Sequence, residues 1–251
     1  MRTLFILLFS LILISDVSAQ KNDRATEIFE EVDTRRSKIT FEKTDMRMII
    51  YNSNGNTRNR SISSFSFNEA DQEKSLLVFE EPANVRGTGF LTLSDGNNEV
   101  QKLYLPALGR IQTITASQKA DRFMGSDFTY EDLGDQNPDD YDFELIEEKN
   151  KTAVLRAVKK ENSQYAYIKF YINTERYSLE KAEYFDEDDE MIKRLEAEDF
   201  TNVDANIWRA NKMTMFDLRA DRKTELIWSN RVINQSIPDW RFTERGLKRG
   251  N

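Results

Sequence analysis

The sequence contains no cysteine and no histidine. The absence of cysteine excludes disulfides, thiol nucleophiles and thiolate metal sites. The absence of histidine removes the usual general base at neutral pH, the Ser-His-Asp triad and nearly all zinc chemistry. Carboxylates or lysine could still support catalysis, but both absences favour a protein that is not an enzyme and that needs neither a cofactor nor a metal.

Glycine and proline are scarce as well, with nine and four residues among 251, whereas aromatic residues make up 11%. This composition is typical of long strands joined by short connections. Positive charge is in the minority, and the formal net charge is −8. An acidic protein is a poor candidate for binding nucleic acid or for electrostatic binding to anionic membranes. We therefore expect no nucleic-acid partner and only transient membrane contact.

Near the amino terminus, a short apolar run from Leu4 to Ile14 follows a basic start and is followed by the small residues Val17-Ser18-Ala19. This pattern is typical of a secretory signal peptide. The run is shorter than the ~20 apolar residues that span a bilayer, although an uncleaved anchor helix stays open as the alternative. No cysteine follows, so a lipid anchor is excluded. We expect a signal peptide over residues 1–19 and a single exported domain over residues 20–251.

From residue 38 onward, hydrophobic and polar residues alternate with a period of two. Short turn signals such as Asn52–Asn56, with Asn-Gly at its centre, separate the alternating runs. About eleven strands with hairpin-length links predict an antiparallel meander rather than βαβ units. One helix, beginning near Arg24, carries Ile28, Phe29 and Val32 on its apolar face. The sequence therefore predicts a mainly β protein with an amino-terminal amphipathic helix.

One sheet of this size cannot stay flat, because strand twist curls it into a barrel or a half-barrel. We expect a curved, incomplete barrel whose concave face either holds a ligand or is filled by its own side chains. The strand alternation predicts one set of residues on that face, the ligand-cavity candidates Met46, Met48, Ile50, Phe65, Phe67, Leu91, Leu93, Ile168 and Phe170.

The alternation stops over residues 116–140, which form a connection too long for an ordinary turn and too aromatic for simple disorder. Such a segment could cover the concave face as a lid, with its glycine permitting a sharp bend. The alternative is a loop held down by hydrophobic anchors. The lid candidates are Phe123, Met124, Gly125, Phe128 and Tyr130.

Three motifs, Val85–Leu91, Leu103–Ile111 and Phe123–Leu133, occur in order along the chain. With them the sequence resembles the LolA-like outer-membrane lipoprotein-sorting proteins, over most of the chain after residue 19. The resemblance implies an incomplete antiparallel barrel with helices at its mouth and a periplasmic location. It also implies that lipid or lipoprotein acyl chains are the partners, and that an inner-membrane exporter acts alongside.

The leading functional hypothesis is a periplasmic carrier or chaperone that shields acyl chains in a hydrophobic cavity for transfer to the outer membrane. A lipid-sensing accessory or regulatory module of a membrane exporter is the alternative. A lipid hydrolase is the weakest reading, because no histidine is present to activate a serine. The acidic stretch 135–140 lacks the glycine and glutamate of a calcium loop, so we expect no metal site there.

Overall fold

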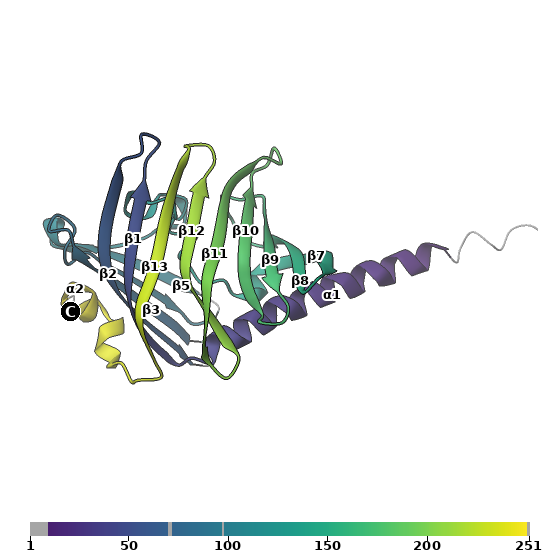
Figure 1. Ribbon diagram of the computed structural model, residues 1–251, viewed down its shortest axis with the longest axis horizontal. Coiled ribbons are helices and arrows are strands. Elements are labelled where there is room, and N and C mark those ends of the chain that lie inside the picture. Colours follow the sequence, from purple (N-terminus) through teal and green to yellow (C-terminus); the bar gives the residue numbers. More distant parts are fainter. Residues whose placement is uncertain (1–9, 70–71, 97, 250–251) are drawn as a thin grey trace, which may run out of the picture.

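The computed structural model describes residues 10–69, 72–96 and 98–249, with side chains from residue 20 onward. One antiparallel sheet dominates it, with thirteen strands in the order β6-β5-β4-β3-β2-β1-β13-β12-β11-β10-β9-β8-β7. The sheet curves strongly (Figure 1), and in the strand order its edge strands β6 and β7 do not pair with each other. The prediction of a mainly β, incomplete antiparallel barrel is confirmed, with two strands more than expected.

The strands follow the chain as two meanders that are joined through the pair β1–β13. Their bounds are β1 Phe41–Tyr51, β2 Thr57–Glu69, β3 Gln72–Glu81, β4 Gly89–Ser94, β5 Glu99–Leu105, β6 Arg110–Thr113, β7 Tyr141–Lys149, β8 Thr152–Lys159, β9 Tyr167–Asn173, β10 Ser178–Phe185, β11 Met191–Asp204, β12 Ile207–Asp217 and β13 Arg222–Ile233. Residues 114–140 connect the two edge strands and carry the short helices η2 Ala116–Gln118, η3 Phe123–Gly125 and η4 Pro138–Asp140.

Helix α1 (Ser10–Ser37) packs against the concave side of the sheet near β7. The Phe29 ring lies 4.7 Å from Phe143 and 5.1 Å from Phe170, centroid to centroid. The amino-terminal half of α1 projects beyond the sheet (Figure 1). The predicted signal peptide falls partly on residues 1–9, which lie outside the described residues, so it stays a prediction. Within the described part of the chain, no helix is both long and apolar enough to span a membrane.

The carboxy-terminal segment covers part of the convex face of the sheet. Its helices η5 (Asp239–Phe242) and α2 (Glu244–Arg249) lie over β3, β4 and β5. A β-carbon at Gly89 would stand 2.7 Å from the Leu247 side chain and 2.8 Å from its carbonyl oxygen, so this close approach requires glycine. The sheet is therefore buried on both faces here, with two separate hydrophobic clusters.

Candidate functional site

A cavity of about 450 Å³ opens on the concave face at the end of the half-barrel where α1 ends. Pockets that hold small ligands in proteins typically measure about 300–1,000 Å³. One wall is apolar and comes from α1, strands β9–β12 and the connection between β6 and β7. Its large side chains are Phe29, Val32, Leu133, Phe170, Ile172, Leu179, Phe200, Trp208 and Met213.

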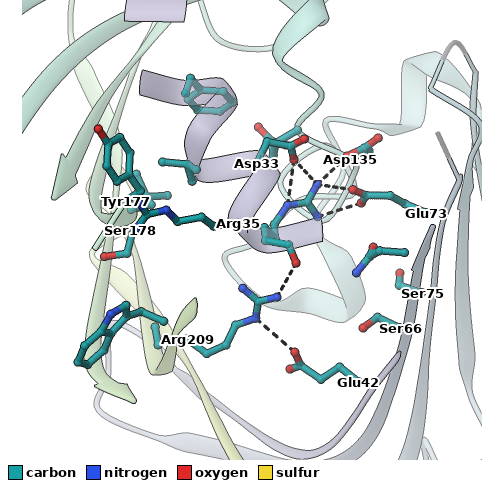
Figure 2. A pocket seen from close by; sticks show the side chains of 18 of the residues that line it. Asp33, Arg35, Glu42, Ser66, Glu73, Ser75, Asp135, Tyr177, Ser178 and Arg209 are labelled. Carbon is teal, nitrogen blue, oxygen red and sulfur yellow. Dashed lines mark hydrogen bonds and ion pairs between the residues drawn. The ribbon is translucent and has the colours of Figure 1, made fainter. Parts of the chain in front are cut away.

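The opposite wall is polar because the strand register aligns small hydroxyl residues across three strands. Ser66 of β2 lies opposite Glu42 of β1 and Ser75 of β3, and Ser75 lies opposite Thr92 of β4. Directly paired residues of an antiparallel sheet share a face. All four residues line the cavity, and Figure 2 shows Glu42, Ser66 and Ser75 on one side of it.

Arg36, in the last turn of α1, is the centre of the charges in this wall, and Figure 2 labels the three carboxylates around it, Asp33, Glu73 and Asp135. Its guanidinium lies 2.8 Å from the Asp33 carboxylate, donates to Glu73 at 2.9 Å and comes within 3.5 Å of Asp135. Burial lowers the pKa of Arg36, but the Glu73 and Asp33 carboxylates outweigh it and the net shift is upward. Burial raises the pKa of Glu73, against the opposing effect of Arg36.

A second charged group adjoins the first. Arg209 of β12 donates to the backbone oxygen of Arg36 at 2.8 Å and to the Glu42 carboxylate at 3.3 Å. Arg231 of β13 also donates to Glu42. Burial lowers the pKa of Arg209, and Glu42 opposes this effect. These side chains link the helix, β1, β12 and β13 around the mouth of the cavity.

Sequence reasoning missed the polar wall, since its residues are scattered along the chain. One signal is present in the sequence. Glu42 is an even number of residues from Met46 and Met48, so its charged side chain is on the same inward-facing side of β1 as theirs. The register that gathers the other polar residues beside it is not visible in the sequence.

The structure divides the predicted cavity residues into three groups. Phe170 lines the cavity. The others that face the concave side belong to the main hydrophobic cluster, deeper in the half-barrel, namely Met46, Met48, Ile50 and Ile168. They are at most 7% exposed and pack against neighbouring side chains.

The remaining four candidates, Phe65, Phe67, Leu91 and Leu93, lie on the convex face, so the expectation that they share the concave face is wrong. Phe65 pairs with Lys43 across β1 and β2, whereas Met46 pairs with Ile62, so Phe65 and Met46 have opposite parity. These apolar side chains are buried because the carboxy-terminal segment covers them.

Of the lid candidates, Phe123, Phe128 and Tyr130 are buried in the main cluster, Met124 packs against it half-buried, and Gly125 is exposed. Phe123 is fully buried, and its ring centroid lies 5.0 Å from Phe90 and 5.7 Å from Tyr130. Phe128 is buried in the same cluster. Met124 and Gly125 both have positive φ, 49° and 76°, so the chain bends sharply between the two buried aromatic anchors.

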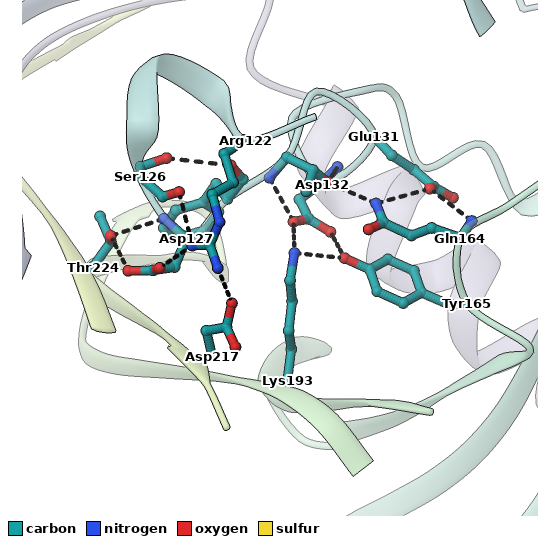
Figure 3. A network of polar contacts seen from close by, with 12 residues as sticks. Arg122, Ser126, Asp127, Glu131, Asp132, Gln164, Tyr165, Lys193, Asp217 and Thr224 are labelled. Atoms are coloured by element: carbon teal, nitrogen blue, oxygen red, sulfur yellow. Dashed lines mark hydrogen bonds and ion pairs between the residues drawn. The ribbon is translucent and has the colours of Figure 1, made fainter. Parts of the chain in front are cut away.

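Salt bridges fasten the segment to β12 and β13 (Figure 3). Asp127 is fully buried, and its carboxylate accepts from Thr224 Oγ1 at 2.7 Å and lies 3.2 Å from Arg222. Arg122 donates to both Asp127 and Asp217. A buried carboxylate held by two cations and a hydroxyl is a strong anchor.

A second anchor joins the segment to β11. The Lys193 ammonium lies 3.1 Å from the Asp132 carboxylate and 2.9 Å from the Tyr165 hydroxyl, which donates to Asp132 at 2.7 Å (Figure 3). Burial and then the Asp132 charge raise the pKa of Tyr165 well above its ordinary value. All three side chains are buried, so this ion pair and its tyrosine partner are a structural link rather than a surface feature.

Comparison with other proteins places this architecture in a family. A model for a family described as uncharacterized proteins matches residues 71–249, more than half of the chain. The chain belongs to the DUF1329 family. The structure of a DUF1329 protein from Desulfovibrio piger has a TM-score of 0.85 at 25% identity and covers 90% of this chain and 99% of that one.

An outer membrane lipoprotein-sorting protein domain from Vibrio parahaemolyticus is similar to this DUF1329 protein at 28% identity and a TM-score of 0.85, covering 91% of this chain and 100% of that one. A LolA superfamily protein from Nitrosomonas europaea shares the fold, at 19% identity and a TM-score of 0.68 over 87% of this chain and 97% of that one. No curated protein sequence matches. The fold is that of LolA-like lipoprotein-sorting proteins, as the sequence motifs predict.

Proposed function

We propose that this DUF1329 protein is a periplasmic carrier that holds acyl chains of a lipid or a lipoprotein in the concave cavity and delivers them toward the outer membrane. The observation that supports this most directly is the apolar wall of the 450 Å³ cavity, inside a half-barrel like that of a lipoprotein-sorting domain. Each methylene removed from water contributes about 0.8 kcal/mol, so such a wall retains an acyl chain without chemistry.

The residues of the apolar wall suit a cargo that must be released from the cavity as well as bound in it. Met213 is flexible and polarizable, and Phe200 and Trp208 give broad, loosely specific contact. Deeper in the half-barrel, Met46, Met48 and Ile168 offer further apolar surface. A chain longer than the cavity reaches this surface only if the packed side chains above it move.

The segment over residues 114–140 is the element that we assign to this movement. It connects the two unpaired edges of the sheet, and its anchors Phe123 and Phe128 occupy the concave interior. Displacing them exchanges protein contacts for contacts with an acyl chain, which offsets part of the cost of opening. In this proposal residues 1–19 direct export, and residues 20–251 form the single carrier domain.

The test begins with protein secreted from a Gram-negative host through its own amino-terminal segment. Native mass spectrometry then identifies co-purified lipid, and incubation with acceptor vesicles measures transfer. We expect bound lipid that moves to the vesicles. Retention of lipid without transfer would favour the sensing module, and protein that neither carries lipid nor takes up added acyl probes would contradict the proposal.

A pair of variants locates the binding. Ala210→Phe adds a ring inside the cavity, and Val154→Phe adds the same ring to the other face of the sheet, on β8. We expect Ala210→Phe to lower the bound lipid severalfold while Val154→Phe leaves it unchanged. Equal lipid content in both variants would place the cargo elsewhere.

A further inference from the structure

Two polar side chains of the cavity lining, both hydroxyls, have no hydrogen-bond partner in the described part of the chain. Thr92 and Ser178 stand on different walls, each is 6% exposed, and both line the cavity. Neither hydroxyl has a hydrogen-bond partner within the part of the chain that the structure describes. The side-chain oxygen of Gln101, paired with Thr92 across β4 and β5, is likewise buried and unpartnered there. Buried polar groups in native proteins normally have partners, so the two hydroxyls of the cavity lining are open to a ligand or to solvent.

The donors of the polar wall are already used. The Arg36 guanidinium donates hydrogen bonds to Asp33 and Glu73. The Arg209 guanidinium donates to Glu42 and to a backbone oxygen. An arginine has donors and no acceptors. A ligand whose polar group accepts hydrogen bonds therefore finds few unused donors in this wall. A ligand that donates hydrogen bonds finds carboxylate oxygens with unused lone pairs.

The charges of this wall do not cancel. Four carboxylates (Asp33, Glu42, Glu73 and Asp135) face three guanidiniums (Arg36, Arg209 and Arg231). The other cations of the cavity lining do not correct the difference. Arg35 is paired with Glu31, and the Lys74 ammonium lies over the Phe67 ring, which belongs to the convex cluster. One negative charge remains in excess, and it is concentrated where three carboxylates share Arg36.

Building on the proposed carrier function, we propose that the cargo carries a protonated amine next to its acyl chain, with the ammonium on the wall of Asp33, Glu73 and Asp135 and the chain on the apolar wall. An ammonium has three donors and no acceptor, which matches the open carboxylate and hydroxyl positions. A fatty acid would bring a fifth carboxylate to a wall that is already negative, and like charges at close range disfavour binding.

Two sources supply this chemistry: the head group of an aminolipid and the free amino terminus of a lipoprotein whose acyl chains are attached through its first residue. Both place an ammonium within a few bonds of the acyl groups. The cavity recognises the shared pair of groups, so the test compares simple amphiphiles first and the two sources afterwards.

The test uses displacement of a fluorescent fatty probe from the full chain at neutral pH by dodecylamine, dodecanol and dodecanoic acid, which share one chain length. We expect dodecylamine to displace the probe at a concentration at least tenfold lower than dodecanoic acid, with dodecanol between them. Equal potency of all three, or tighter binding of the acid, would overturn the amine assignment while the carrier proposal stands. No displacement by any of them would remove the carrier proposal itself.

Variants assign the effect to the wall. Glu73→Gln and Asp135→Asn each remove one carboxylate, and Glu144→Gln removes an exposed carboxylate of β7 outside the cavity. We expect the first two to weaken dodecylamine about tenfold without weakening dodecanol, and the third to change neither. If Glu73→Gln does not fold, the binding of dodecylamine to Asp135→Asn still tests the amine assignment. Unchanged dodecylamine binding in the folded variants would contradict the assignment of the amine to this wall.

The two sources are then separated by competition. Lysophosphatidylethanolamine stands for the aminolipid, and a short peptide with a diacylglyceryl thioether and a free amino terminus stands for the lipoprotein. The source that loses affinity in Asp135→Asn is the one whose amine reaches the wall. Loss for neither source would overturn the amine assignment.

Discussion

Arg36, at the end of α1, donates to Glu73 of β3 at 2.9 Å and thereby joins the helix to the sheet across the mouth of the cavity. Asp33 and Asp135 surround the same guanidinium. Together with Asp135, the pair thus connects three elements that are distant in the chain, and it borders the site that we assign to the cargo. Its two roles, holding the mouth and presenting carboxylates, can be separated by mutation.

Removing the cation should destabilise the protein. Arg36→Met leaves three carboxylates facing one another, but the Arg36 side chain is 37% exposed, so solvent screens part of the loss. We expect about 1–2 kcal/mol less free energy of unfolding, measured in urea. Lys151→Met, which breaks the exposed pair with Glu175, serves as the control and should cause no measurable change. Equal stability of both variants would contradict a structural role for Arg36.

Breaking the buried link between Lys193 and Asp132 should loosen residues 123–134. Lys193→Met leaves the Asp132 carboxylate buried without its cation, and losses of about 3–5 kcal/mol are typical of such changes. The double variant Lys193→Met, Asp132→Asn should lose less than Lys193→Met alone, because no unpaired charge remains. Hydrogen exchange should rise first in residues 123–134. A uniform rise over the whole sheet would show that the link does not control this segment.

The lid assignment predicts that its anchors control exchange of cargo. Phe123→Ala and Phe128→Ala remove buried rings and should each cost about 3–5 kcal/mol of stability. They should also speed lipid uptake from donor vesicles and release to acceptor vesicles. Phe242→Ala removes a buried ring of the convex cluster, away from the segment, and serves as the control. If the two lid variants exchange lipid at the rate of wild type, the lid proposal is wrong.

Stability should fall at alkaline pH. Burial first, and the Asp132 charge second, raise the pKa of both Tyr165 and Tyr184 well above its ordinary value. The unfolded chain therefore releases these protons first, above pH ~10. Their contribution to stability is complete below that pH and is lost above it, by up to about 1.4 kcal/mol per pH unit for each tyrosine.

Urea unfolding between pH ~8 and ~11 measures this loss. Tyr184→Phe removes one of the two titrating groups and should make the decline above pH ~10 less steep than in wild type. An identical slope in the variant and wild type would show that Tyr184 does not contribute.

The sequence predicted the alternating strands well because period-two alternation follows directly from strand geometry. Met46, Met48 and Ile168 lie on the concave side as expected. Alternation alone predicts the wrong face for Phe65 and Phe67 because both faces of β2 are buried. Ser64 and Ser66 face the concave side, whereas the two phenylalanines lie on the convex side, in the cluster that includes Phe242 and Leu247. Alternation separates two faces, but it does not say which one is concave.

Taken alone, the sequence determined a chain of antiparallel strands, an amphipathic helix and the motifs of a lipoprotein-sorting fold, because these depend on local spacing. Only the tertiary structure decided where the cavity lies and what lines it. Arg36, Glu73 and Asp135 meet because sheet curvature brings α1, β3 and the connection between the edge strands together. Ser66, Ser75 and Thr92 form one row because the strands pair in one register, and pairing register is a property of the assembled sheet.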